Sequence, residues 1–218
     1  MRILHTSDLH GEWARKEFRE NVQKSLNEFD VWVDTGDFFP NITRGAVRVE
    51  VPQQHSWVKS YQVCESILSF LDGRPMISVP GNHDYISLAE KLKEAGGSAY
   101  EITPSGVEVL GLIWAGFREI PWIIGEWNGE TNSPELQVIV DKVWETNPDI
   151  LVTHSPPGGI LDNRRGVNSL GTALRYKENK IRAHLFGHIH ELGGQEEKIL
   201  DCTFYNGARG AHIITLGE

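Results

Sequence analysis

Short apolar runs that end in a polar or glycine-containing turn recur along the chain. The runs at 2–7, 31–33, 76–79, 149–152 and 183–186 predict buried strands. Between them, 12–29, 57–71, 86–95 and 133–143 carry apolar residues near helical spacing and predict helices that cover a sheet. Strands that alternate with helices indicate an α/β fold with parallel strand pairs.

Local signals define the remaining elements. Ser133 and Pro134 predict a helix start, with serine as the N-cap and proline at the first helical position. The stretch 107–115 predicts two short strands. Residues 198–205 and 211–216 predict two closing strands that pair antiparallel through the Asn206–Gly207 turn.

Two long segments lack a regular period. Residues 38–54 follow a strand end and predict a loop at the rim of a pocket, where Arg44 or Arg48 could contact substrate phosphate or simply lie on the surface. Residues 117–132 combine aromatic and helix-breaking residues, among them Trp122 and Trp127. This second segment is either a specificity loop with aromatic walls or a packed surface loop.

Composition narrows the class of protein. The 218 residues, 39% of them hydrophobic, predict one domain over 1–218. The formal net charge of −9 argues against general affinity for nucleic acid or an anionic membrane. Cys64 and Cys202 lie in apolar settings without metal-binding spacing, which favours buried thiols in a reducing compartment. Without a signal-like or membrane-spanning segment, we expect a cytoplasmic protein without membrane contact.

Polar residues follow five of the predicted strands. Because i and i+2 side chains of an extended segment point the same way, each Asp-x-His or His-x-His pair is expected to face one cavity. Asp34 is expected to cap its turn, with a supporting role at the site as the alternative. The candidate ligands are Asp8, His10, Asp37, Asn82, His154, His188 and His190.

This set combines carboxylate, amide and imidazole donors without sulfur. Such a set suits two adjacent divalent ions, with manganese preferred and iron, zinc or nickel as alternatives. Two dications with two aspartates leave a positive excess, which would attract a phosphate ester to an otherwise acidic protein. His5, His55, His184 and His212 fall outside the pattern and are interpreted as structural or surface histidines.

The ordered motifs resemble those of the calcineurin-like metallophosphoesterase superfamily. They are Asp8-x-His10, Gly36-Asp37, Gly81-Asn82-His83-Asp84, His154 and Gly187-His188-x-His190, and they span 8–190. The segments around His154, His190 and Asn206 are similar to the compact branch of vertebrate metallophosphoesterase-domain proteins and related bacterial phosphodiesterases.

The resemblance implies a four-layer αββα sandwich of two mixed sheets flanked by helices, with a dinuclear metal site at the strand ends. Asp8, His10, Asp37 and His190 would hold one ion, and Asn82, His154, His188 and the shared Asp37 the other. His83 would lie beside the leaving group, with Asp84 orienting it. A hydroxide that bridges the ions would then attack phosphorus in line.

The substrate is less constrained than the chemistry. We expect a phosphodiesterase acting on small, cyclic nucleotide-like diesters, because the acidic chain shows no nucleic-acid module. The alternatives are a phosphomonoesterase or protein phosphatase, then a nuclease, which would need a basic groove. Asp84 stands where the Ser/Thr phosphatase branch typically has an arginine after Gly-Asn-His. A non-catalytic metal-binding scaffold is the alternative from another class.

Overall fold

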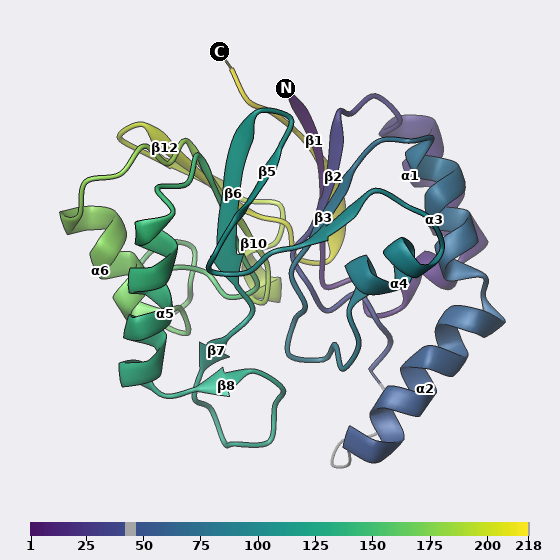
Figure 1. Ribbon diagram of the computed structural model, residues 1–218, viewed down its shortest axis with the longest axis horizontal. Coiled ribbons are helices and arrows are strands. Elements are labelled where there is room, and N and C mark those ends of the chain that lie inside the picture. Colours follow the sequence, from purple (N-terminus) through teal and green to yellow (C-terminus); the bar gives the residue numbers. More distant parts are fainter. Residues whose placement is uncertain (42–46, 218) are drawn as a thin grey trace.

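Two mixed β-sheets pack face to face in the computed structural model, which describes residues 1–41 and 47–217. The first sheet has the order β13-β1-β2-β3-β4, and the second has the order β11-β12-β10-β9-β6-β5. A third pair, β7 with β8, lies beyond them. Figure 1 shows helices α1 to α4 outside the first sheet and α5 and α6 outside the second.

The strands of the first sheet are β1 (Arg2–Ser7), β2 (Val31–Asp34), β3 (Met76–Ser78), β4 (Ala99–Glu101) and β13 (Gly210–Thr215). Those of the second are β5 (Val107–Val109), β6 (Leu112–Phe117), β9 (Ile150–Thr153), β10 (Ala183–Phe186), β11 (Glu196–Ile199) and β12 (Cys202–Asn206). The small pair consists of β7 (Ile120–Pro121) and β8 (Glu130–Thr131).

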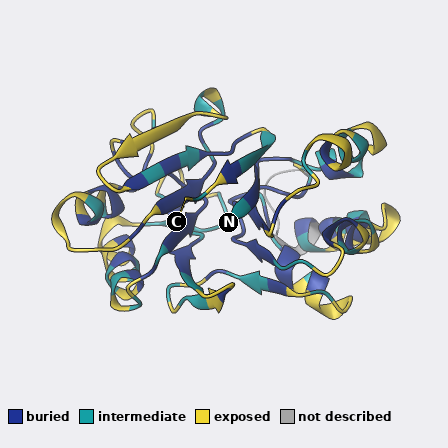
Figure 2. Cartoon of the chain, turned by 90° about the horizontal axis from the view of Figure 1, so that it is seen from above, coloured by how far each residue is buried: buried dark blue, intermediate teal, exposed yellow. Residues whose placement is uncertain are grey.

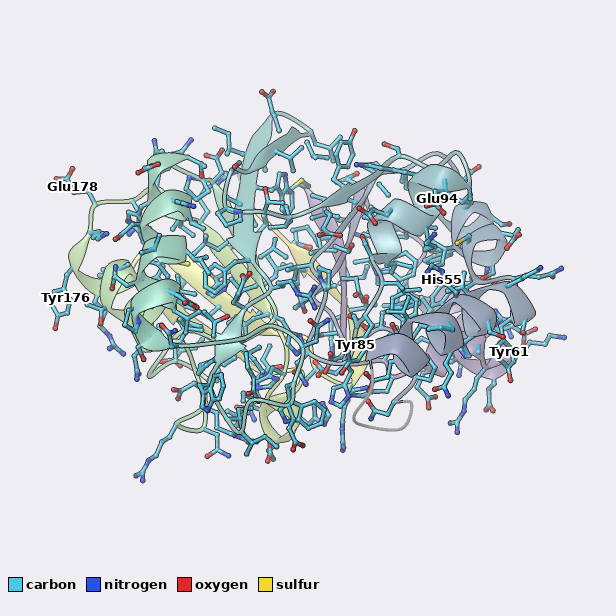
Figure 3. All side chains as sticks on the ribbon, turned by 60° about the horizontal axis from the view of Figure 1, so that its bottom comes forward. His55, Tyr61, Tyr85, Glu94, Tyr176 and Glu178 are labelled. Atoms are coloured by element: carbon cyan, nitrogen blue, oxygen red, sulfur yellow. The ribbon has the colours of Figure 1, made fainter. Side chains whose placement is uncertain are left out.

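The helices are α1 (Lys16–Ser25), α2 (Val47–Ser60), α3 (Val63–Leu71), α4 (Leu88–Glu94), α5 (Ser133–Glu145) and α6 (Asn168–Tyr176). Short 3-10 helices cover η1 (Glu12–Ala14) and η2 (His190–Leu192). Tyr61, just beyond α2, and Tyr176, at the end of α6, lie at opposite ends of the molecule (Figure 3). None of the described helices is both long and apolar enough to cross a bilayer.

Successive side chains of a strand point to opposite faces of its sheet, so both faces of each sheet are covered by apolar residues. The three resulting hydrophobic clusters lie between four layers of secondary structure. On β2, Val31 and Val33 face the cluster between the sheets, while Trp32 faces the helices beside the first sheet. Another cluster joins the second sheet to α5 and α6 through residues such as Leu136 and Phe186. Figure 2 shows buried strands between outer helices whose outward surfaces are exposed. The predicted four-layer αββα architecture is confirmed.

The structure corrects two helix predictions. The stretch 12–29 divides into η1 and α1, because Arg15 between them is extended with φ −78° and ψ 118°. The stretch 57–71 lies in two helices, since Gln62 takes a left-handed φ of 48° between α2 and α3. The structure also changes the predicted loop 38–54. Part of this segment is helical, because α2 begins at Val47. Arg44 lies outside the described residues.

Two further local predictions are wrong. The N-cap of α5 is Asn132, whose side chain accepts a hydrogen bond from the Glu135 amide, so Ser133 is already helical. The two closing strands do not form a hairpin. β12 runs parallel to β10 in the second sheet, while β13 pairs antiparallel with β1 in the first. The chain therefore crosses between sheets after Asn206, whose side-chain oxygen accepts the Ala208 amide.

His184 offers a test of how burial contributes to stability. Its side chain is buried, its Nε2 lies 2.8 Å from the Thr153 Oγ1, and burial lowers its pKa to about 3. Below pH 6.5 the unfolded chain takes up a proton that the folded chain does not, so stability falls as pH decreases toward 3.

We predict that His184→Gln reduces stability at neutral pH, and that the difference from the wild type narrows as pH falls. The narrowing should approach about 1.4 kcal/mol per pH unit below the unfolded-state pKa. Urea unfolding of both metal-free proteins between pH 7.5 and 4.5 measures it. If the difference in the free energy of unfolding between the two proteins is the same at every pH, His184 does not contribute to the loss of stability in acid.

Candidate metal centre

The carboxyl ends of five parallel strands meet at one edge of the sandwich. Asp8 follows β1, Asp37 follows β2 after a short turn, and Asn82 follows β3 in the first sheet. His154 follows β9 and His188 follows β10 in the second sheet. The carboxyl edge of parallel strands is the usual ligand-binding edge of α/β proteins. In Figure 1 both chain termini lie at the opposite end, above the sheets.

Several of the predicted ligands have strained backbone conformations. Their φ angles are 53° at Asp8, 43° at His10, 54° at Asp37 and 67° at His188. Residues other than glycine rarely adopt this left-handed region, and such conformations cluster at functional sites. The sequence-based reason for pairing Asp8 with His10 is therefore wrong: β1 ends at Ser7, and the two side chains converge through left-handed turns instead of extended alternation.

Asp8 is a buried carboxylate with several fixed donors. Its Oδ2 accepts hydrogen bonds from the Ser7 hydroxyl at 2.6 Å and the His188 amide at 2.9 Å, while Oδ1 lies 2.9 Å from His190 Nε2. Burial acts to raise the pKa of Asp8, but His190, His154 and Ser7 together outweigh it, and the pKa is lowered. A Cβ at Gly187 would lie 2.3 Å from Asp8 Oδ2, so only glycine fits there.

Asp37 occupies a central position among the histidines. Its Oδ2 lies 3.4 Å from His154 Nε2, 3.9 Å from His83 Nε2 and 4.0 Å from His10 Nε2. Its Oδ1 accepts the His83 amide at 2.7 Å. Burial opposes ionisation of Asp37, yet the charge of His154 lowers its pKa. The carboxylate therefore stays ionised although it is buried.

His154 is fully buried with one ring nitrogen fixed. Its Nδ1 donates to the Thr35 carbonyl at 2.7 Å, which leaves Nε2 directed at Asn82 Oδ1, 3.0 Å away, and at Asp37. Burial alone would lower the pKa of His154, but Asp37 raises it to about 10. A histidine with one nitrogen held by a carbonyl and the other facing oxygen atoms has the geometry of a metal ligand.

Among the described residues, two groups of side chains have ligand atoms close enough to share an ion: Asp8, His10 and His190, and Asp8, Asp37 and His154. In addition, the buried His10 Nδ1 has no hydrogen-bond partner among the described residues. The donors are oxygen and nitrogen only, since both cysteines are buried elsewhere without a disulfide. These residues fit the divalent ions that the sequence predicts. Asp8 is common to both groups, and the assignment of ligands to individual ions stays a prediction.

His188 completes the cluster from the second sheet. Its ring centroid lies 5.0 Å from that of His154, and burial lowers its pKa to about 4. A neutral imidazole is the form that binds a metal ion. The structure therefore brings together all seven predicted ligand residues: Asp8, His10, Asp37, Asn82, His154, His188 and His190.

His83 and Asp84 lie in the turn after β3, but not as a hydrogen-bonded pair. The Asp84 carboxylate accepts backbone amides from Gly81 at 2.8 Å and Phe39 at 3.1 Å. Within the described part of the chain, no hydrogen bond joins it to the His83 imidazole, so the predicted orienting contact is not formed. Burial, together with the charge of Asp37, raises the pKa of Asp84 to about 6. Asp84 instead joins the turns after β2 and β3.

Asp34 caps the turn after β2, as expected. Its Oδ1 accepts the Gly36 amide at 3.1 Å, and its Oδ2 accepts the Thr6 hydroxyl at 2.6 Å. Burial raises the pKa of Asp34 well above its ordinary value. This carboxyl group therefore supports the turn that carries Asp37 and supplies no ligand atom to the two groups above.

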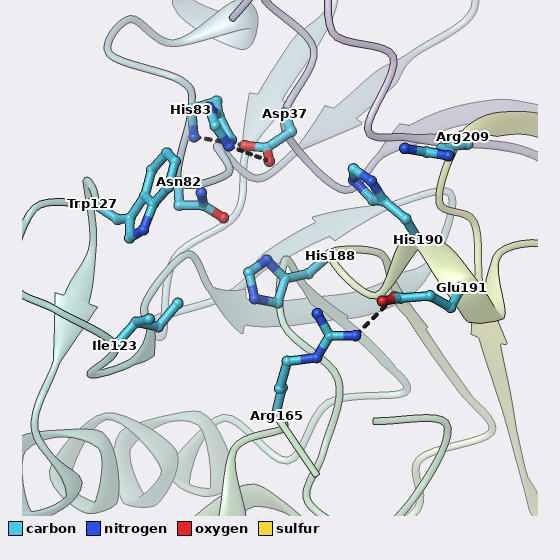
Figure 4. Close-up of a pocket in the computed structure, with 10 residues that line it drawn as sticks. All are labelled: Asp37, Asn82, His83, Ile123, Trp127, Arg165, His188, His190, Glu191 and Arg209. Atoms are coloured by element: carbon cyan, nitrogen blue, oxygen red, sulfur yellow. Dashed lines mark hydrogen bonds and ion pairs between the residues drawn. The ribbon is translucent and has the colours of Figure 1, made fainter. Parts of the chain in front are cut away.

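A pocket of about 470 Å³ opens onto this cluster (Figure 4). It is lined by Asp37, Asn82, His83, Ile123, Trp127, Arg165, His188, His190, Glu191 and Arg209. Trp127 belongs to the segment 117–132, so that segment contributes an aromatic wall. The described residues of 38–54 do not line this pocket, although the Gln54 side chain donates to the His83 carbonyl at 2.6 Å.

Sequence reasoning missed Arg165, Glu191 and Arg209 as pocket residues. Arg165 Nη2 donates to Glu191 Oε2 at 2.7 Å across the rim. Glu191 directly follows the last predicted ligand, His190, and this position was the signal in the sequence that it could line the pocket. Nothing local distinguishes Arg165 or Arg209 from surface arginines, because each comes from a loop that only the tertiary fold brings to the pocket.

Comparisons with known proteins agree with this arrangement. The chain is 38% identical over 101 residues to metallophosphoesterase domain-containing protein 1 of Homo sapiens, covering 42% of this chain and 28% of the human protein. The Mus musculus protein of that name matches to the same extent. The match thus spans 28% of the length of these relatives.

The fold resembles that of TT1561 from Thermus thermophilus, with a TM-score of 0.66 and 16% identity, covering 95% of this chain and 88% of that chain. At this low sequence identity, the likeness is evidence for the fold alone. A family model described as calcineurin-like phosphoesterase matches residues 1–192, which include every predicted ligand. The chain therefore belongs to the calcineurin-like phosphoesterase family.

Proposed function

We propose that this chain is a two-metal phosphodiesterase that hydrolyses small, cyclic nucleotide-like diesters. The observation that carries the proposal is the convergence of seven oxygen and nitrogen ligand residues on one pocket at the strand ends. Hydrolysis would consume one water: a bond forms between its oxygen and phosphorus, one ester P–O bond breaks, and the leaving oxygen takes a proton.

The seven ligand residues would hold two divalent ions, proposed to be manganese. Such ions polarise a phosphoryl oxygen and lower the pKa of bound water. The protein's own contribution begins with Asp37, which holds the His83 amide at 2.7 Å and so positions the imidazole at the pocket. His83 would deliver a proton to the leaving oxygen. Burial lowers the pKa of His83, so the protonated imidazole is a stronger acid but a smaller fraction of the protein carries that proton at neutral pH.

The charge on the pocket rim favours a diester. A phosphate monoester dianion needs more compensating positive charge than a diester monoanion. Glu191 pairs with Arg165 at 2.7 Å and reduces the positive charge that this arginine offers to phosphate. The pocket, about 470 Å³ in volume, also has room for substituents on both sides of phosphorus.

A phosphomonoesterase is the second candidate, and Arg209 is the observation that favours it. This residue is a further cation lining the pocket. The formal net charge of −9 supports a small substrate over nucleic acid. A cytoplasmic location stays a prediction from the sequence.

The decisive assay compares a chromogenic phosphodiester with its matching monoester, using manganese-reconstituted protein. We expect a higher kcat/KM on the diester. His83→Ala should reduce turnover by about 10²- to 10⁴-fold, because it removes the proton donor, while elemental analysis still finds both ions.

Each other outcome has a distinct meaning. A higher kcat/KM on the monoester would establish the phosphatase alternative. No turnover of either ester by protein that binds two ions would favour the metal-binding scaffold. Loss of metal in His83→Ala would place His83 among the ligands.

Glu191→Gln tests the charge argument separately. Removing the carboxylate charge should raise the ratio of monoester to diester kcat/KM by about two- to fivefold, as expected for an exposed ion pair. Glu197→Gln is the matched control, because it makes the same charge change at an exposed position of β11 that does not line the pocket. An equal ratio in all three proteins would mean that Glu191 does not set the preference.

A further inference from the structure

The pocket has two chemically different walls (Figure 4). One is apolar and consists of Ile123 and Trp127; the other is polar and consists of Arg165, Glu191 and Arg209. The cluster residues Asp37 and His188 lie between the walls. A phosphoryl group at the cluster would therefore have one substituent beside an indole and the other beside charged side chains.

Trp127 is placed directly against His83. Their ring centroids lie 4.5 Å apart, with an angle of 62° between the ring planes. A substituent on the His83 side of phosphorus would consequently meet the indole. Aromatic rings prefer edge-to-face or offset-stacked neighbours at such separations, so this wall favours a planar aromatic group.

The segment that carries Trp127 is fastened to the turn that carries His83. The neighbouring Asn128 Nδ2 donates to the Asp84 carbonyl at 2.6 Å. Arg118 Nη2, at the other end of the segment, donates to the Asp84 carbonyl at 3.1 Å and the Gly81 carbonyl at 3.3 Å. The pairing of β7 with β8 closes the base of the segment. The indole is therefore held in a defined position relative to the imidazole.

The apolar wall continues onto an exposed surface. Ile123 is 50% exposed, and its neighbours Trp122 and Ile124 are 63% and 55% exposed. Ile123 both lines the pocket and belongs to this exposed run. Apolar surface that is contiguous with a pocket and faces water is a common feature of ligand-binding sites. A flat apolar substituent on Trp127 would also cover Ile123.

We infer that the substrate carries a planar aromatic substituent, such as a nucleobase or another aryl group, which packs on Trp127 and Ile123. This inference rests on the proposed function of the same site and names the substrate class. It makes Trp127 a specificity-determining residue, whereas Trp122 on the same segment is not part of the pocket lining.

Phosphonates test the inference without turnover, because their P–C bond does not hydrolyse. Phenyl-, cyclohexyl- and methylphosphonate share the anionic group and differ in the substituent. Isothermal titration of the manganese-loaded wild type should give phenylphosphonate the tightest binding, about 5- to 150-fold tighter than methylphosphonate, as for aromatic stacking. Cyclohexylphosphonate should fall between them.

Three variants separate specific packing from a structural role. Trp127→Ala should weaken phenylphosphonate binding far more than methylphosphonate binding and so remove most of the phenyl preference, whereas Trp127→Phe should retain part of it. Trp122→Ala, the matched control, should behave as the wild type.

Two results would overturn the inference: equal phenyl-to-methyl ratios in the wild type and Trp127→Ala, or cyclohexylphosphonate binding as tightly as phenylphosphonate. Equal weakening of all three ligands in Trp127→Ala would also overturn it, because Trp127 would then only support His83. A wild type that shows the phenyl preference but hydrolyses no diester would refute the proposed function and leave the aromatic site established.

Discussion

Burial of two carboxylates at one point between the sheets is the constraint on which the site depends. Asp8 and Asp37 are 3% and 2% exposed. Buried charges are costly unless hydrogen bonds and opposite charges surround them. Here the Ser7 hydroxyl and the backbone amides of His83 and His188 supply hydrogen bonds, and histidines surround both groups.

That constraint accounts for the strained backbone around the carboxylates. A residue that simply continued an extended strand would point its side chain to one face of its own sheet, toward the core between the sheets or toward the outer helices. The left-handed turns at Asp8, Asp37 and His188 redirect side chains from both sheets toward a shared centre. Gly187 and Gly81 permit the close approach, since a Cβ at either position would overlap a carboxylate oxygen. Burial of apolar side chains contributes stability that offsets such strain, and the cluster around Val33, Val152 and Leu185 lies buried between the two sheets that carry these turns.

Loops from different parts of the chain then surround the cluster with a pocket whose two walls differ. The segment 117–132 is anchored on the turn after β3 and presents an apolar wall. The opposite wall comes from the turns after β9 and β10, through Arg165 and Glu191. The predicted ligand residues fit metal-dependent chemistry, whereas the walls are proposed to determine which ester is accepted. A family can therefore keep one cluster and change its substrates through the loops.

The sequence by itself determined the α/β class, the family and the seven residues that we predict as metal ligands, because strand-end motifs are local and their order along the chain is specific. The resemblance also implied the four-layer fold, which the structure confirms. What only the tertiary structure decided were features that depend on distant partners: the separate sheets of β12 and β13, the backbone contacts of Asp84, and the arrival of Arg165 and Arg209 at the pocket. A strand pairs with whichever strand edge lies next to it after the core has packed, and a buried carboxylate binds whichever backbone amides lie nearby. No local sequence pattern encodes these long-range neighbours.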